Sequence, residues 1–186
     1  MAVTYKEALN EIKKRVPNKN LVKHMIATAA AMKAWAEYFG EDQRRWELAG
    51  LLHDIDLGEV KDLNLHSIRG AEIVRDELGI DDDEKYWAIY THNDAHGIEP
   101  KSLMGKVLRA VDPLTGLIVA ATLVLPSKKI ADLKVESVLK RFKEKRFAAG
   151  ANRELIKSCE TFGVDLKTFI EITLKAMQGV AQDIGL

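Results

Sequence analysis

The sequence has few of the features that mark secreted, membrane or disulfide-stapled proteins. One cysteine, Cys159, is present among 186 residues, so no disulfide can form within the chain. The longest apolar run, residues 116–125, is too short to cross a bilayer. No signal peptide pattern follows Met1, because charged residues begin at Lys6 and continue at helical spacing. We therefore expect a soluble, cytoplasmic protein with no membrane partner.

A net charge is also lacking. Lysine and arginine together number 28 and so do aspartate and glutamate, which gives a net charge of zero. This balance argues against a protein that coats nucleic acid, so no stable nucleic-acid partner is expected. An apolar fraction of 47% is enough for a sizeable core. Length and composition therefore predict one domain over residues 1–186.

Alternating strand patterns, internal repeats and low-complexity linkers are absent, whereas helical periodicity runs through nearly the whole sequence. The pattern predicts an all-α fold with helices over residues 4–16, 20–39, 42–52, 67–78, 85–92, 102–125, 135–147, 152–162 and 166–184. Pro113 predicts a kink or a restart in the sixth of these helices. The last helix is expected to pack on the core, with a homodimer contact as the alternative. Trp35, Trp46 and Trp87 are expected to pack in the core.

The sequence has only five histidines: His24, His53, His66, His92 and His96. His53 and Asp54 follow an apolar run, residues 48–52, that should be buried. Burying an imidazole and a carboxylate costs free energy unless something pairs with them. A divalent cation would do so, and this ligand pair suits Mn, Fe, Zn, Ni or Co. The alternatives are ordinary core or surface histidines and, for Asp112, a helix N-cap before Pro113.

The order His24, His53-Asp54, Asp112 resembles the H…HD…D signature of the HD superfamily of metal-dependent phosphohydrolases. Residues 48–55, LAGLLHDI, are similar to the A-x-L-L-H-D-I segment of that family, and residues 66–72, HSIRGAE, resemble the H-x-x-x-G-A helix start of HDIG-type members. His92 in YTH matches a later histidine, and residues 109–115 resemble A-A-D-x-L-T/S. The match covers about residues 20–125.

The resemblance implies a single HD-domain helical bundle, in which a metal-site core over about 20–125 precedes C-terminal helices over 126–186. Two positions depart from the HDIG pattern. Asp56 stands where HDIG-type proteins have glycine, and Asn93 stands where many two-metal members have a second histidine. His96 is a candidate to replace that missing ligand.

The resemblance also implies a site with two divalent metal ions, drawn from Mn, Fe, Ni, Co, Zn or Mg. One ion would be bound by His24, His53, Asp54 and Asp112, and the second by His66 and His92, with Asp54 bridging the two. Asp54, His66 and His92 would be the catalytic residues. If one ion binds, His66 and His92 would instead contact phosphate or protonate the leaving oxygen.

Candidate substrate-binding residues lie at helical spacing from these ligands and in a basic segment. Arg69 is one turn after His66, Arg109 is one turn before Asp112, and Thr115 follows three residues after Asp112, where it could orient a ligand or bind phosphate. Residues 126–157 carry ten basic and four acidic side chains. Within that segment, the side chains flanking a small-residue turn at 147–151 are candidates for phosphate contact: Lys145, Arg146 and Arg153. Ordinary surface or core-edge packing is the alternative for each.

These observations lead to an expected function: hydrolysis of a phosphate ester, of a nucleotide or another small phosphorylated metabolite, by a metal-activated water. Two alternatives stay open. An HD-fold diiron oxygenase would use a very similar ligand set, and a regulatory HD module would bind metal or nucleotide without turnover. The sequence leaves the exact substrate, the metal and the oligomeric state undetermined.

Overall fold

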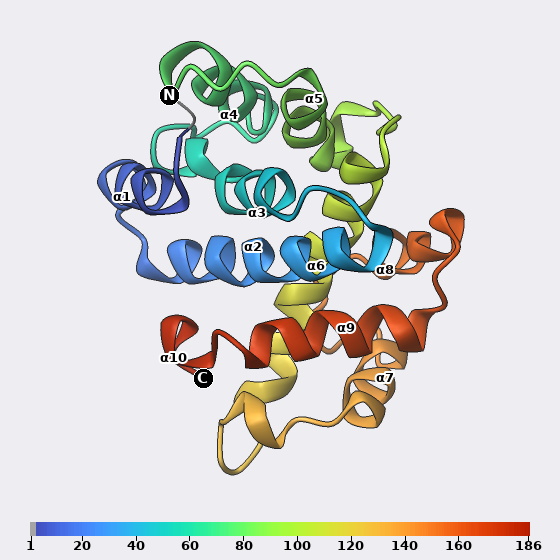
Figure 1. The fold of residues 1–186 in the computed structure, drawn as a ribbon. Coiled ribbons are helices and arrows are strands. Elements are labelled where there is room, and N and C mark those ends of the chain that lie inside the picture. Colours follow the sequence, from blue (N-terminus) through green and yellow to red (C-terminus); the bar gives the residue numbers. More distant parts are fainter. Residues whose placement is uncertain (1–2) are drawn as a thin grey trace.

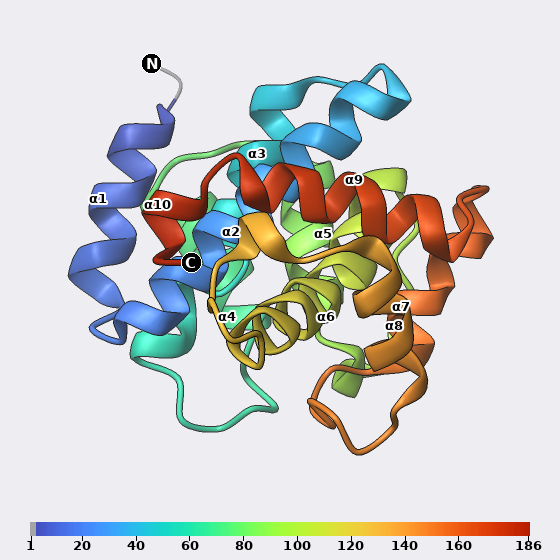
Figure 2. The same cartoon turned by 90° about the horizontal axis from the view of Figure 1, so that it is seen from below.

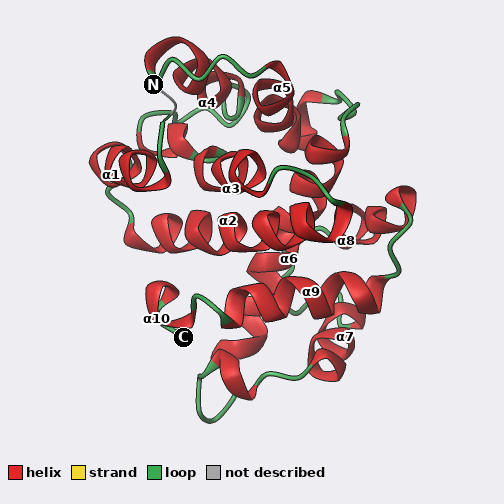
Figure 3. Cartoon of the chain, in the orientation of Figure 1, coloured by secondary structure: helices red, strands yellow, loops and turns green. Residues whose placement is uncertain are grey.

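The computed structural model describes residues 3–186, and this part of the chain holds helices and loops but no strand (Figures 1 and 3). The predicted all-α fold is therefore confirmed. The longer helices are α1 (Tyr5–Arg15), α2 (Lys19–Phe39), α3 (Gln43–Leu52), α5 (Asp83–His92), α6 (Leu103–Leu123), α7 (Val135–Lys143) and α9 (Leu166–Gln178). The short helices are α4 (Ile68–Glu72), α8 (Arg153–Lys157) and α10 (Ala181–Ile184), and 3₁₀ turns cover Ile55–Gly58, Asp94–His96, Ile130–Asp132 and Ser158–Phe162.

Helix starts follow side chains that satisfy free backbone N–H groups. Thr4 accepts a hydrogen bond from the backbone of Glu7, whose carboxylate accepts one from the backbone N–H of Thr4, which completes a capping box at α1. Asn18 caps α2 and Asp42 caps α3 in the same manner. Gly40 ends α2 with a φ of 72°, a conformation that costs glycine little. The first three helices therefore begin and end close to their predicted bounds.

Helix α2 runs through the centre of the molecule, with α3 on one side of it and α9 on the other (Figure 1). Helix α6 crosses this layer and packs against α2, α5 and α9 (Figure 2). Trp35 in α2 is fully buried, and its Nε1 donates a hydrogen bond to the Thr173 hydroxyl of α9 at 3.0 Å. The C-terminal helix α9 thus packs on the core that the earlier helices build.

Two predictions about aromatic and proline residues need correction. Trp87 is half exposed rather than buried, because α5 turns Ala88 and Ile89 toward the core and Trp87 away from it. Of the kink or restart predicted at Pro113, the restart is wrong, because α6 continues through the proline to Leu123. Burial of apolar side chains along α6 on both sides of the proline offsets the lost backbone hydrogen bond.

Other predicted helices are shorter than their periodicity suggested. The 67–78 segment becomes α4 followed by a π-helical turn over Ile73–Glu77, and the 152–162 segment becomes α8 followed by a 3₁₀ turn. The 135–147 segment ends at Lys143, and the 166–184 segment breaks between α9 and α10 at Gly179. Within residues 3–186, no helix is long and apolar enough to cross a membrane.

The single cysteine should be unreactive toward thiol reagents in the folded protein. Cys159 has no exposed surface, and burial raises the pKa of its thiol to about 11. Because the thiolate is the nucleophile, we expect a thiol reagent at pH 8 to label Cys159 only after denaturant unfolds the chain. Stoichiometric labelling of native protein within minutes would contradict this packing.

Candidate metal centre

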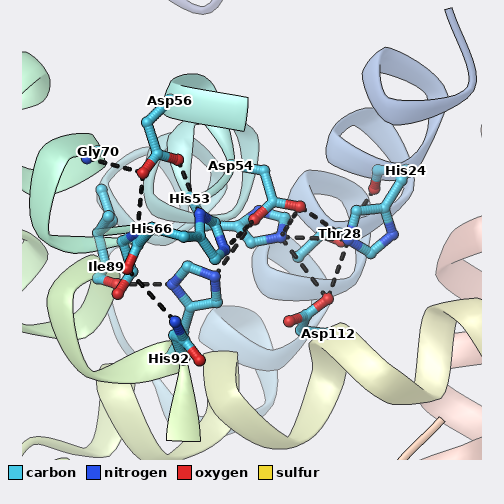
Figure 4. A network of polar contacts seen from close by, with 12 residues as sticks. His24, Thr28, His53, Asp54, Asp56, His66, Gly70, Ile89, His92 and Asp112 are labelled. Atoms are coloured by element: carbon cyan, nitrogen blue, oxygen red, sulfur yellow. Dashed lines mark hydrogen bonds and ion pairs between the residues drawn. The ribbon is translucent and has the colours of Figure 1, made fainter. Parts of the chain in front are cut away.

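Four imidazoles and two carboxylates from five segments of the chain converge on one point (Figure 4). His24 comes from α2 and Asp112 from α6, whereas His92 is the last residue of α5. His53 and Asp54 follow α3, and His66 precedes α4. The structure therefore brings together all six residues that the resemblance implied as metal ligands.

The end of α3 is what lets two neighbouring side chains reach the same point. His53 keeps helical backbone angles, with φ −60° and ψ −31°, but Asp54 has left them, with φ −110° and ψ 20°. Consecutive residues inside a helix point about 100° apart, so both could not face one site there. The preceding run, including Leu51 and Leu52, is fully buried and anchors this end of the helix in the core.

Asp54 lies between two groups of histidines (Figure 4). Its Oδ2 is 3.2 Å from Nε2 of His53 and 3.5 Å from Nε2 of His24. Its Oδ1 is 3.3 Å from Nε2 of His66 and 3.2 Å from Nε2 of His92. On the first side, Asp112 Oδ1 adds a contact 2.9 Å from Nε2 of His24. One carboxylate therefore joins two separate clusters of ligand atoms.

The opposite ring nitrogen of each histidine is held by a hydrogen-bond acceptor. Nδ1 of His53 donates to the Gly50 carbonyl at 2.7 Å, and Nδ1 of His92 donates to the Ile89 carbonyl at 2.6 Å. The Thr115 hydroxyl donates to the Asp112 carbonyl, so it accepts from Nδ1 of His24 at 3.1 Å. The His66 Nδ1 donates to Asp56 at 3.0 Å.

These contacts determine what the centre can bind. With the proton on Nδ1, each Nε2 presents a lone pair to carboxylate oxygens that also carry lone pairs. Two sets of side chains each bring three ligand atoms within 4.8 Å of one another: His24, His53 and Asp112, and His53, Asp54 and His92. Such a buried group of acceptors requires a cation or bound protons, and this donor set fits divalent transition metals. The residues thus fit a metal site.

The pKa shifts of the histidines and of Asp54 also favour positive charge at the centre. Burial lowers the pKa of His66, but its hydrogen bonds with Asp54 and Asp56 outweigh burial and raise it to about 9. Burial likewise opposes protonation of His53, yet the charge of Asp54 raises the pKa of His53 well above its usual value. Burial raises the pKa of Asp54, but the His53 charge and the histidine hydrogen bonds hold it well below its usual value. In the metal-free chain, protons therefore occupy the centre.

Thr115, Arg69 and Arg109, all predicted to bind substrate, have defined partners in the structure. The Thr115 hydroxyl contacts Nδ1 of His24 at 3.1 Å and so orients that imidazole. Arg69 pairs with surface carboxylates, with its Nε 2.8 Å from Glu59. Arg109 is buried in α6 and lies 3.1 Å from Glu99. Neither guanidinium hydrogen bonds to any of the six converging side chains within the described range.

Of the other basic candidates, Lys145 and Arg146 lie in the loop after α7, and Arg153 is the first residue of α8. Lys145 and Arg146 are exposed there, whereas the Arg153 guanidinium donates to main-chain carbonyls around that loop. Its acceptors are the carbonyl oxygens of Arg141, Phe142, Glu144, Phe147, Ala148 and Ala151. The structure thus shows Arg153 holding the loop together, with its donors already engaged.

Replacing Arg153 with lysine should loosen this loop. A single ammonium group cannot reach carbonyls that a planar guanidinium bonds from three nitrogens, so several acceptors would lose their partner. We expect a loss of about 2–4 kcal/mol in the free energy of unfolding, measured by denaturant titration, and faster proteolysis within residues 144–151. Unchanged stability would show that water replaces these hydrogen bonds at no cost.

Two residues near His66 have roles that differ from the sequence expectation or were missed by it. His96 was a candidate ligand, but its Nε2 is 2.7 Å from the His66 carbonyl and 3.0 Å from the Ser67 hydroxyl, so it braces the backbone instead. Asp56 has no exposed surface and contacts His66 directly. The only sequence signal for Asp56 was its departure from the HDIG glycine, which does not reveal where the carboxylate points.

Comparison with known proteins agrees with this geometry. The family model described as HD domain matches residues 21–118, which is more than half of the chain and includes all six converging side chains. No solved structure matches the chain. HD domains are typically metal-dependent hydrolases, and the His/Asp cluster can hold a metal ion. By the match and the centre that it contains, this chain belongs to the HD domain family.

Proposed function

We propose that the chain is a metal-dependent phosphohydrolase that cleaves a phosphate ester of a nucleotide or another small phosphorylated metabolite. The observation that carries this proposal is the position of Asp54, whose two oxygens face two different groups of imidazoles at 3.2–3.5 Å. Membership of the HD family supports it, because that family consists typically of metal-dependent hydrolases.

The donor atoms divide into two sets, each suited to one divalent cation. His24, His53 and Asp112 lie with Asp54 Oδ2, and His66 and His92 lie with Asp54 Oδ1. When two cations such as Mn, Fe, Ni, Co, Zn or Mg are bound, they lower the pKa of a water and stabilise both oxygens of an in-line displacement. Asp54 would fix the position of one set of donor atoms relative to the other, because its single carboxylate belongs to both.

The burial of the centre indicates the side from which a substrate would arrive. His53 has no exposed side-chain surface and His92 only 2%, whereas His24 is 23% and Asp112 28% exposed. A phosphate group would therefore approach past His24 and Asp112. The buried side, which His53 and His92 line, excludes water and so strengthens electrostatic interactions within the centre. Contacts of Lys145 and Arg146 with the substrate remain a prediction of this proposal.

The test is hydrolysis of a panel of nucleotides and other phosphomonoesters and diesters, measured as phosphate release from the monoesters and as release of the alcohol or nucleoside product from the diesters. The purified chain is assayed with Mn²⁺ and, in parallel, after dialysis against a chelator. We expect release from at least one compound class that disappears with the metal and returns when Mn²⁺ is restored. Oxygen consumption with two bound irons and no phosphate release would instead indicate a diiron oxygenase. Tight nucleotide binding without turnover would indicate a regulatory module.

A further inference from the structure

Asp56 is a second buried carboxylate beside the centre that the proposed mechanism does not use. It has no exposed surface, and within residues 3–186 it pairs with no lysine or arginine. Its Oδ2 accepts hydrogen bonds from the backbone N–H groups of Ser67 at 2.8 Å and Gly70 at 3.2 Å. Its Oδ1 lies 3.0 Å from Nδ1 of His66. A carboxylate buried in this way is costly and calls for a compensating role.

The backbone around Asp56 carries strain. Ser67 has a φ of 71°, a left-handed conformation that non-glycine residues seldom adopt, while its N–H points at Asp56 and its hydroxyl donates to the Tyr90 carbonyl at 2.7 Å. A Cβ at Gly70 would lie 3.3 Å from the Asp56 carboxyl group. Strain of this kind persists where surrounding contacts impose it, and it is common at functional sites.

His66 is also held from the opposite side. The ring of His96 contacts the His66 carbonyl at 2.7 Å, and the Asn93 side chain donates to the same carbonyl at 3.3 Å. The end of α5 and the turn after it therefore clamp the backbone of His66, while Asp56 holds its ring. Both constraints direct Nε2 of His66 toward Asp54 Oδ1.

His66 differs from the other three imidazoles in the charge of the group that accepts a hydrogen bond from its Nδ1. His53 and His92 donate to main-chain carbonyls and His24 to a hydroxyl, all of which are neutral. Among the four, only His66 has a carboxylate as the acceptor for its Nδ1. A carboxylate acceptor fixes the imidazole tautomer and makes Nε2 a more basic metal ligand.

We infer that Asp56 is a positioning residue that holds His66 with its proton on Nδ1 and thereby strengthens metal binding at the position of His66 and His92. The inference rests on the proposed function in one respect, namely that this position binds the second of two metal ions. Asp56 itself touches no substrate; it acts through His66.

Asp56→Asn tests the inference with little change in shape. The amide oxygen can still accept from Ser67 and Gly70, which turns the amide NH₂ group toward Nδ1 of His66. The imidazole would then carry its proton on Nε2, where it cannot bind a metal. In a Zn²⁺ titration followed by calorimetry, we expect the second ion to bind about 10–100-fold more weakly and the first to bind within about threefold of wild type.

The matched control is Asp82→Asn, which removes a carboxylate that pairs with Arg45 of α3 at 2.9 Å and caps the start of α5, at the opposite end of that helix from His92. It should lower stability while both Zn²⁺ ions bind as in wild type. Equal Zn²⁺ binding by Asp56→Asn and wild type would overturn the inference. Loss of both ions to the same extent would also overturn it, because it would show general disruption of the centre.

Nitrogen NMR of the imidazoles gives a second readout that does not depend on the variant folding or on two ions binding. In Zn²⁺-loaded wild type, His66 should be protonated at Nδ1 and bound through Nε2; a proton on Nε2 would reject the role of Asp56. If wild type binds only one Zn²⁺, the two-metal part of the proposed function fails. In that case the tautomer of His66 in wild type, recorded above pH 9, still decides the role of Asp56.

Discussion

Asp54→Asn is expected to reduce metal-dependent phosphate release by at least about 1,000-fold in kcat/KM. The carboxylate of Asp54 faces four Nε2 atoms, two on each oxygen, so its charge serves both halves of the centre at once. An amide of the same shape has one acceptor and one donor, and its NH₂ group would face imidazole lone pairs on one side. Binding of metal at both positions should therefore fail together. Assays run with Mn²⁺ on the best substrate of the panel measure the effect.

Asp76→Asn is the matched control for this experiment, because Asp76 is exposed and, among the residues that the structure describes, pairs only with Arg75 at 2.8 Å. It should leave both metal content and phosphate release unchanged. Circular dichroism of Asp54→Asn should show the helical content of wild type, since the helices are built on a core that the substitution does not touch. Phosphate release by folded Asp54→Asn within tenfold of wild type would contradict the assignment of this carboxylate to the reaction.

The second large effect concerns pH. Metal affinity should fall steeply as the pH falls, because a metal must displace the protons that occupy the metal-free centre. The pKa of His66 is about 9, so this imidazole is protonated at neutral pH when no metal is bound, and the charge of Asp54 raises the pKa of His53 well above its usual value. Each proton that the metal displaces lowers the apparent association constant about tenfold for each pH unit of decrease, so the proton on His66 alone lowers it about 100-fold between pH 8 and pH 6.

Zn²⁺ competition with a chelator at pH 6, 7 and 8 gives the slope, and calorimetry in two buffers of different ionisation enthalpy counts the protons released. The same shift predicts the opposite trend for the metal-free fold. A raised histidine pKa contributes stability that is complete below about pH 6.5 and is lost as the pH rises through about 9. An association constant that is flat from pH 6 to 8 would show that the metal-free centre holds no protons.

Local signals were sufficient for much of this structure. Thr4, Asn18 and Asp42 begin helices where their side chains can satisfy free N–H groups, which requires only nearby residues. Periodicity located the long helices, although it overestimated several ends. The six converging residues were identified through their order and spacing in the HD pattern, and the structure places them together (Figure 4).

What the local signals missed depends on contacts between distant segments. Asp56 is marked in the sequence only by its departure from the HDIG glycine, and the approach of Ser67 and Gly70 makes it a buried partner of His66. Arg153 looks like a phosphate ligand until its loop folds back and surrounds it with carbonyl oxygens. Pro113 looks like a helix start because the packing that carries α6 through it comes from other helices.

The physical reason is a difference in range. Caps and amphipathic faces act within a few residues, so the chain carries them in adjacent positions and a single sequence displays them. The direction of a hydrogen bond, the burial of a carboxylate and the tautomer of an imidazole depend on groups brought in from elsewhere in the fold. Asp56, which contacts the His66 ring, lies ten residues before His66 in the chain. His96, which contacts the His66 carbonyl, lies thirty residues after it. That arrangement exists only once α3, α4 and α5 have packed together.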